Sequence, residues 1–251
     1  MITQYTPYFP EYYNQYFEPF IGGGAVFFHL NPLNAHISDV NEELFQTYRV
    51  VRDKVESLIK DLGRYVNTEE YFYQVRLQKP SDLSDIEVAS RFIFLNHTCF
   101  NGLYRVNRRG QFNAPFGFYK NPMIQNELGL RGASKALQGV DIQCCDFEEA
   151  LVGAKHNDFV YLDPPYIPLT PTSNFTSYSS GGFNIGDQER LAKLVGKLGL
   201  RGCKIMLSNS DTPLTRKLYE GFKIVSVKAR RAINSDSTKR GPVSEVLVLN
   251  Y

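Results

Sequence analysis

One short segment constrains the fold of this chain most: the apolar run at 159–162 is followed at once by Asp163, Pro164, Pro165 and Tyr166. Proline has no N–H for a sheet ladder, so a buried strand must end there and present these groups at its carboxyl end. Ligands of open α/β sheets bind beyond such ends. The carboxylate and the Pro164 carbonyl can accept hydrogen bonds from an exocyclic amine, and the tyrosine ring can stack on a heterocycle. The segment predicts an acceptor site for a flat polar ligand, whereas the plainer interpretation is a turn that only ends a strand.

A second signal lies near the amino terminus, where an apolar strand runs into glycines 22–24 and then into a short helical pattern. This is the layout of the first βα turn in a nucleotide-binding sheet, although the full dinucleotide spacing is missing. Two further strands are expected to end in acids, Asp39 and Asp146. Either acid alone is more often an ordinary helix cap. Together with Asp163, they predict a nucleoside cofactor beside a second planar substrate.

These motifs resemble those of Dam-type (D12 class) DNA adenine-N6 methyltransferases, which use S-adenosylmethionine, and especially the restriction-modification members that methylate GATC. The similar segments are 18–25, 38–41, 101–117, 146–148, 163–178 and 231–251. The resemblance implies an α/β fold, a Rossmann-like class I methyltransferase mixed sheet with an inserted helical and β-hairpin target-recognition lobe. It also implies that the cofactor is bound by Glu18, Pro19, Phe20, Gly22, Gly23, Asp39, Asp146, Phe147 and Asp163.

The start of the chain departs from the family pattern. Members of the family begin with a Lys-Trp-type segment that helps to bind the cofactor and, through a lysine, a target guanine. This chain starts at Met1-Ile2-Thr3-Gln4, just past that segment. Two interpretations stay open: the start is truncated, or the protein manages without that wall of the cofactor site.

Basic residues gather in two stretches, although the net charge of the chain is only +2. The first stretch, 105–120, interleaves arginines with aromatic side chains, a mixture that suits phosphate contact and packing against bases. The second stretch is 228–240. A merely solvated surface is the alternative for each. By resemblance, Phe100 and Asn101 form a wedge into the base stack, while Leu103, Arg105 and Pro115 contact bases. The other expected DNA-binding residues are Arg108, Arg109, Arg231 and Arg240.

The hydrophobic pattern predicts alternating strands and helices, hence a mostly parallel sheet wrapped by helices. Strands are expected near 16–21, 34–39, 140–144, 158–162, 203–208, 222–227 and 244–250, and the last two are expected to form an antiparallel edge hairpin. Helices are expected at 41–53, 85–98 and 187–198. Residues 57–130 are far too long for a crossover and predict a separate DNA target-recognition domain, so the catalytic domain takes 1–56 and 131–251. Within the insertion, 103–113 reads as two short strands about a polar turn.

The expected chemistry follows from these ligands. An adenine amine is a poor nucleophile, so acceptance of its hydrogen bonds by Asp163 and the Pro164 carbonyl returns electron density to nitrogen. Pro165 and Tyr166 complete the expected catalytic set. The amine cannot be reached inside a duplex, so the adenine must be flipped onto the Tyr166 ring, and the segment 172–178 is expected to close over it. Two alternatives remain: methylation of another target such as cytosine N4 or RNA, and an inactive sequence-specific DNA-binding protein.

The remaining sequence features are mainly exclusions. The cysteines and histidines show no paired metal-ligand spacing, so no metal site is expected. Free cysteines are typical of a reducing cytoplasm. No signal peptide or membrane-spanning run is present in the sequence. The expected partner is double-stranded DNA, and a restriction endonuclease that acts separately is a candidate second partner.

Overall fold

The computed structural model describes residues 2–107, 109–168, 182–230 and 242–251. The described residues fall into two units, a first unit of 2–38, 145–168, 182–230 and 242–251, and a second unit of 39–107 and 109–144. The expected domain boundaries, 57–130 against the rest, stay a prediction about which residues recognise DNA. The second unit already begins at the end of the second strand.

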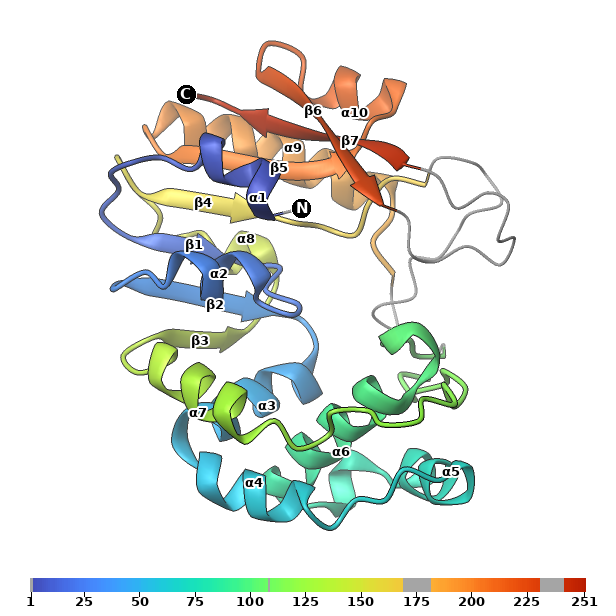
Figure 1. Cartoon of the computed structure of the whole chain (residues 1–251). Coiled ribbons are helices and arrows are strands. Elements are labelled where there is room, and N and C mark those ends of the chain that lie inside the picture. The colour runs from blue at the N-terminus through green and yellow to red at the C-terminus, as the bar shows by residue number, and fades with distance from the viewer. Residues whose placement is uncertain (1, 108, 169–181, 231–241) are drawn as a thin grey trace. The chain divides into compact units, whose positions relative to one another are not determined.

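The strands of the described residues form a seven-stranded sheet in the order β3-β2-β1-β4-β5-β7-β6. They are β1 (Tyr16–Glu18), β2 (Ala35–Asp39), β3 (Asp141–Cys144), β4 (Phe159–Leu162), β5 (Lys204–Ser210), β6 (Lys223–Arg230) and β7 (Pro242–Leu249). The β1–β2, β1–β4 and β4–β5 pairs are parallel. Strand β7 runs antiparallel to both β5 and β6, as Figure 1 shows at the red end of the chain. The predicted mixed α/β sheet and its antiparallel edge hairpin are confirmed.

The helices of the described residues begin largely where capping residues predict. They are α1 (Ile2–Tyr5), α2 (Ala25–Leu30), α3 (Glu42–Asp53), α4 (Val55–Leu62), α5 (Glu69–Leu77), α6 (Asp85–Thr98), α7 (Glu127–Ala136), α8 (Phe147–Ala150), α9 (Ile185–Leu200) and α10 (Pro213–Leu218). Single 3₁₀ turns lie at Thr6–Tyr8, Pro80–Asp82 and Phe100–Gly102. The Asn41 side chain caps α3 as expected, by accepting from the Leu44 N–H at 3.2 Å. Helix α9 is longer than expected, because Asn184 and Asp187 form a capping box at its start and it continues through Gly199.

In the first unit, alternate residues of each strand face opposite layers. One face places Phe17, Val160 and Leu207 against apolar residues of α8 and α9. The other face carries aromatic rings: Tyr16 packs on Phe159 with ring centroids 5.6 Å apart and on Phe27 of α2 at 6.5 Å. The sheet of the first unit is therefore packed on both faces (Figure 1), so a ligand is expected at the strand ends and loops.

The second unit has its own core around α5 and α6, where Phe72, Phe94 and Leu95 are fully buried. The expected two short strands at 103–113 shorten to a single bridge between Val106 and Phe112. Backbone bonds flank the bridge, from the Asn107 N–H to the Gln111 carbonyl at 2.8 Å and from the Asn113 N–H to the Arg105 carbonyl at 2.9 Å. Beyond the bridge the Asn107 side chain closes the turn, because its Oδ1 accepts from the N–H groups of Arg109 at 2.9 Å and Gln111 at 3.1 Å. The polar turn itself is present.

Candidate active site at the strand ends

The pleat of the sheet brings three polar side chains to one face at one end of the first unit. The register pairs Tyr161 of β4 with Met206 of β5, and Leu162 with Leu207. Extending that register by one residue sets Asp163 opposite Ser208, and the Ser208 hydroxyl donates to Asp163 Oδ1 at 2.5 Å. Glu18 ends the neighbouring strand β1. Alternation places Glu18, Asp163 and Ser208 on the face that also carries Tyr16.

Asp163 is the most accessible member of this group. The residue is exposed, but neighbouring side chains displace water from around its carboxylate. The displacement of water by those side chains raises the pKa of Asp163, and hydrogen bonds from Ser208 and Tyr166 counteract part of that rise. Asp163 therefore combines an accessible surface with a pKa above the ordinary value of an aspartate. Such a group is suited to accept a hydrogen bond from a ligand.

Glu18 is the buried partner, with only 2% of its surface exposed. The Tyr16 hydroxyl donates to Glu18 Oε2 at 2.6 Å. Burial raises the pKa of Glu18 to about 8; the Tyr16 bond opposes this rise and the nearby charge of Asp163 adds to it. Ionisation of such a buried carboxyl group is costly, and a cation bound beside it would lower that cost.

The glycine turn after β1 is shaped by backbone conformations that favour glycine. Gly22 and Gly24 have φ angles of 46° and 67°. The Ile21 N–H donates to the Ser38 carbonyl at 3.0 Å, which ties this turn to the end of β2. A Cβ added at Gly22 or Gly23 would meet nothing within 4 Å. Open space beside both glycines fits a ligand that approaches the backbone closely.

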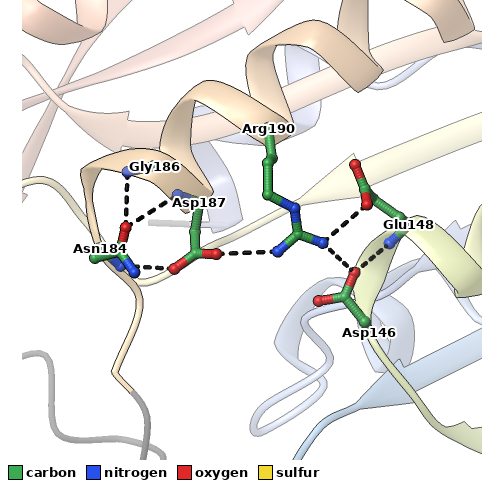
Figure 2. A network of polar contacts seen from close by, with 6 residues as sticks. All are labelled: Asp146, Glu148, Asn184, Gly186, Asp187 and Arg190. Carbon is green, nitrogen blue, oxygen red and sulfur yellow. Dashed lines mark hydrogen bonds and ion pairs between the residues drawn. The ribbon is translucent and has the colours of Figure 1, made fainter.

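Asp146 caps the short helix α8 and also pairs with an arginine (Figure 2). Arg190 of α9 reaches Asp146 and Glu148, each at 2.9 Å, and Asp187 at 3.0 Å. Its guanidinium also lies 4.9 Å from the centre of the Phe147 ring. Sequence patterns do not single out Arg190, because within a helix it looks like an ordinary surface residue.

Aromatic rings gather beside this ion-pair network. The expected cofactor residues Phe20 and Phe147 are stacked, with ring centroids 5.5 Å apart. Phe183 packs edge-on against Phe20 at 5.7 Å, and it was not expected from the sequence. The structure thus brings the glycine turn and the Asp146-Phe147 pair together within the first unit.

The two prolines and Tyr166 follow Asp163 as a segment held by side chains. Tyr166 is half-buried, and its hydroxyl donates to Glu245 Oε2 at 3.4 Å. The Pro165 carbonyl accepts from Gln188 Nε2 at 2.8 Å. Charged and phenolic neighbours make the hydroxyl hard to ionise: burial, Asp163 and Tyr5 all raise the pKa of Tyr166. Neither Gln188 nor Glu245 is apparent from sequence pattern.

Asp39, the remaining expected cofactor residue, is the first residue of the second unit. It ends β2, is buried, and accepts from the Asn41 N–H at 3.0 Å. Asp39 therefore does not cap α3 itself; Asn41 does. Pro19 lies in the turn directly after β1.

The expected DNA-binding residues of the second unit lie around the end of α6. Phe100 is 52% exposed, and its N–H donates to the Pro115 carbonyl at 2.8 Å. Asn101 has a φ of 57° and Leu103 is partly exposed, so this turn presents side chains outward. Arg105 is held by Asn113: Nε donates to Oδ1 at 2.7 Å and Nη2 to the backbone carbonyl at 3.1 Å.

The basic turn residue Arg109 is exposed. The expected DNA contacts Arg108, Arg231 and Arg240, and the expected closing segment 172–178, lie outside the described residues. Within the ranges that the structure describes, no group of three or more His, Cys, Asp and Glu side chains is placed to hold a metal ion. None of the described helices is both long and apolar enough to cross a membrane.

The sheet order, with an antiparallel last strand inserted beside β5, and the acid-proline-proline-tyrosine segment after β4 define a Rossmann-like methyltransferase. The family model of the D12 class N6 adenine-specific DNA methyltransferases matches residues 2–233, and the chain belongs to this family. It is an adenine-specific DNA methyltransferase, and DNA is its substrate. Membership in this family also sets aside cytosine N4 and RNA as targets.

Relatives cover most of the chain. A type II methyltransferase of Lactococcus lactis subsp. cremoris is 44% identical over 250 residues, which span 96% of this chain and 88% of the relative. A type II methyltransferase of Methanocaldococcus jannaschii is 45% identical over 255 residues, 94% of this chain and 88% of the relative. The DNA adenine methylase of Escherichia coli K12 is 34% identical over 236 residues, 92% of this chain and 84% of the relative.

Proposed function

We propose that the protein transfers a methyl group from S-adenosylmethionine to N6 of adenine within GATC in double-stranded DNA. The observation that carries the proposal is the pair of carboxyl groups of Glu18, which ends β1, and Asp163, which directly follows the adjacent strand β4. The charge of Asp163 contributes to the raised pKa of Glu18. A methyl donor of the sulfonium type is a cation, and a site with two carboxyl groups suits it. The resemblance of 101–117 and 163–178 to GATC-methylating enzymes supports the target sequence.

The residues around the glycine turn fit this cofactor. Open space at Gly22 and Gly23 lets a nucleoside approach the backbone. Phe20, Asp146 and Phe147 suit its base, Asp39 its ribose hydroxyls, and Glu18 its charged amino acid part. When bound, S-adenosylmethionine supplies an electrophilic methyl group on a positively charged sulfur.

The target amine is prepared by Asp163 and Pro164. One N6 hydrogen is donated to the Asp163 carboxylate and the other to the Pro164 carbonyl, which draws the nitrogen lone pair out of the ring. Transfer of the methyl group to N6 would make this nitrogen acidic, and Asp163 would accept the proton that it loses. Most of the rate enhancement comes from positioning, which is worth about 7–11 kcal/mol in favourable cases.

The adenine must leave the duplex to reach these groups. Tyr166 offers its ring to the flipped base, and its hydroxyl bond to Glu245 fixes the ring orientation. Phe100 and Asn101 fill the space left in the base stack, and Arg105 reads a neighbouring base. These roles assign DNA recognition to the predicted domain 57–130.

The proposal is tested by methyl transfer from labelled S-adenosylmethionine to duplexes that contain GATC or single-base variants of it, with the product nucleoside identified by mass spectrometry. N6-methyladenine in GATC duplexes is the expected product. Asp163→Ala is expected to lower turnover by orders of magnitude, because the amine loses its acceptor. Asp53→Ala, which removes an exposed carboxylate of the second unit, serves as the control. An inactive wild-type protein that binds GATC would identify a DNA-binding protein without activity.

The target sequence has its own test in Arg105. Arg105→Ala is expected to relax discrimination at one base pair, with a loss of about 1–3 kcal/mol against the correct site. Binding to GATC and to its single-base variants is measured at several salt concentrations. Equal weakening of every duplex would make Arg105 a phosphate anchor, the role that we propose for Arg231 and Arg240.

A further inference from the structure

Pro164 and Pro165 cannot donate the backbone hydrogen bonds that hold a segment in a sheet, because proline has no N–H. Two side-chain amides hold this segment instead, one on each side of Tyr166. Gln188 Nε2 of α9 donates to the Pro165 carbonyl at 2.8 Å. The Ile167 N–H donates to Asn209 Oδ1 of β5 at 3.0 Å.

The two amides also bond to each other, since Asn209 Nδ2 donates to Gln188 Oε1 at 3.2 Å. Asn209 Oδ1 accepts a further bond from the Ser210 N–H at 2.8 Å. Asn209 is 0% and Gln188 2% exposed. A buried amide without partners is costly, so each side chain has one favoured orientation, and that orientation fixes the segment.

The pleat of β5 explains how a single strand contacts both Asp163 and Ile167, on the two sides of the proline pair and Tyr166. Consecutive strand residues point to opposite faces. Ser208 lies on the face of Asp163 and donates to its carboxylate. Asn209 lies on the face covered by α9, where Gln188 meets it. Strand β5 thus fixes Asp163 from one side and the residues around Tyr166 from the other.

We propose that Gln188 and Asn209 are positioning residues for methyl transfer, which hold Pro165 and Tyr166 so that the acceptor groups and the stacking ring keep their spacing. The inference rests on the proposed function, in which Asp163 to Tyr166 bind the target adenine. Neither amide touches the reacting atoms. A misplacement of about 1 Å at a reacting centre costs on the order of 100-fold in rate, so the loss of either amide bond is expected in turnover rather than in cofactor affinity.

Gln188→Glu is the sharpest test, because it keeps the side-chain size and the acceptor for Asn209. An ionised carboxylate cannot donate to the Pro165 carbonyl, whereas a protonated one can. We expect turnover at pH 8 to fall about 10- to 100-fold, with the Kd of S-adenosylmethionine within about twofold of wild type. The ratio of variant to wild-type turnover is expected to rise as the pH falls. Single-turnover rates and melting temperatures are measured at each pH.

Asn250, which follows β7, provides a matched control because its side-chain amide bonds to backbone groups at the start of β5, whereas Asn209 lies near the end of that strand. Asn250 Oδ1 accepts from the Ile205 N–H at 2.7 Å and its Nδ2 donates to the Cys203 carbonyl at 2.8 Å. Asn209→Ala is expected to lower both the melting temperature and turnover well below the melting point. Asn250→Ala is expected to lower the melting temperature alone.

Two results overturn the inference while the proposed function stands. One is a Gln188→Glu enzyme as active as wild type at every pH. The other is a loss of turnover in Asn250→Ala as large as that in Asn209→Ala, which would make the amides structural only. A wild-type protein that transfers no methyl group would instead overturn the proposed function and this inference with it.

Discussion

Among single residues, the proposed site contains two carboxyl groups, Asp163 and Glu18, whose pKa values are raised by burial. Asp163 is exposed yet crowded, Glu18 is buried, and hydroxyl groups of Ser208 and Tyr16 donate to them. Charge therefore becomes favourable where a cation or an amine is bound. The same arrangement makes both groups sensitive to pH.

Ser208 is expected to influence the pH below which methyl transfer slows, through its hydrogen bond to Asp163. Its hydrogen bond favours the ionised form of Asp163 and so lowers the pKa that burial has raised. Ser208→Ala is expected to raise this pKa, so the acid limb of kcat/KM moves to higher pH. The pH profile of kcat/KM for methyl transfer measures it. An acid limb at the wild-type position would show that Asp163 does not control this limb.

Glu18 is expected to make the ligand-free protein less stable as the pH rises. Its pKa is about 8 in the folded protein against an ordinary value of 4.5, so between these values the folded state binds the additional proton. The contribution of Glu18 to the free energy of unfolding is fully present below pH 4.5. Between pH 4.5 and about pH 8 the free energy of unfolding falls by up to about 1.4 kcal/mol per pH unit. Denaturant unfolding of wild type and Glu18→Gln from pH 4 to 9 measures it.

The Glu18→Gln protein should lack this slope, and parallel curves for the two proteins would contradict the assignment. Binding of a cation beside Glu18 should also release a proton near neutral pH. Calorimetry with S-adenosylmethionine in buffers of different ionisation enthalpy would detect that proton. S-adenosylhomocysteine keeps the ammonium group but lacks the sulfonium charge, so the comparison shows how much of the proton release depends on the sulfonium.

Among the helices and strands, α9 contacts residues of the proposed site through one turn of its amino-terminal half. Gln188 points to β5 and the Pro165 carbonyl, while Arg190, two residues on, points to α8. The capping box at Asn184 and Asp187 fixes where this turn begins. A helix that began one residue later would present different side chains to both neighbours.

Arg190 is expected to support cofactor binding through Asp146 and Phe147. Arg190→Gln leaves Asp146, Glu148 and Asp187 without their shared cation. Because these groups are partly exposed and screened by solvent, we expect a modest effect, about a 3- to 10-fold rise in the Kd of S-adenosylmethionine that shrinks at high salt. Calorimetry at low and high salt measures it.

Arg216 is the matched control, because this exposed residue makes a two-point pair with partly buried Asp211 through bonds of 2.7 and 2.9 Å. Arg216→Gln should leave the cofactor Kd unchanged. An equal rise in both variants would point to general electrostatics rather than to Asp146. No change in Arg190→Gln would remove Arg190 from the cofactor site.

At the scale of the whole molecule, the chain forms two units with different means of stabilisation. The first unit buries apolar residues on both faces of its sheet. The second unit depends in part on a buried ion pair, Arg91 to Glu43 at 2.6 Å, that joins α6 to α3. Arg91 is 3% exposed and also donates to the carbonyls of Val75 and Arg76.

Arg91→Met is expected to destabilise the protein by about 3–5 kcal/mol, because it leaves the Glu43 carboxylate buried without its cation. Burial already raises the pKa of Glu43 and Arg91 opposes this rise. Denaturant unfolding measures the loss, and Arg131→Met, which removes an exposed arginine of the same unit, should leave the midpoint nearly unchanged. Recovery of stability in Arg91→Met/Glu43→Leu would confirm the reason, and a small loss in Arg91→Met would contradict it.

Sequence patterns were enough to predict the strands, the starts of α3 and α6 and the presence of the Asp163 to Tyr166 segment, because each depends on local properties such as alternation, capping and the missing N–H of proline. Membership in an adenine-specific family was also recoverable, since its motifs keep their order along the chain. Only the tertiary structure shows that Ser208, Gln188, Asn209 and Arg190 contact residues of the proposed site. Their contacts depend on strand register and helix rotation, which bring together residues up to 47 positions apart. In 103–113, only the structure shows that the expected pairing is limited to one bridge, beyond which the Asn107 side chain bonds the N–H groups of the turn.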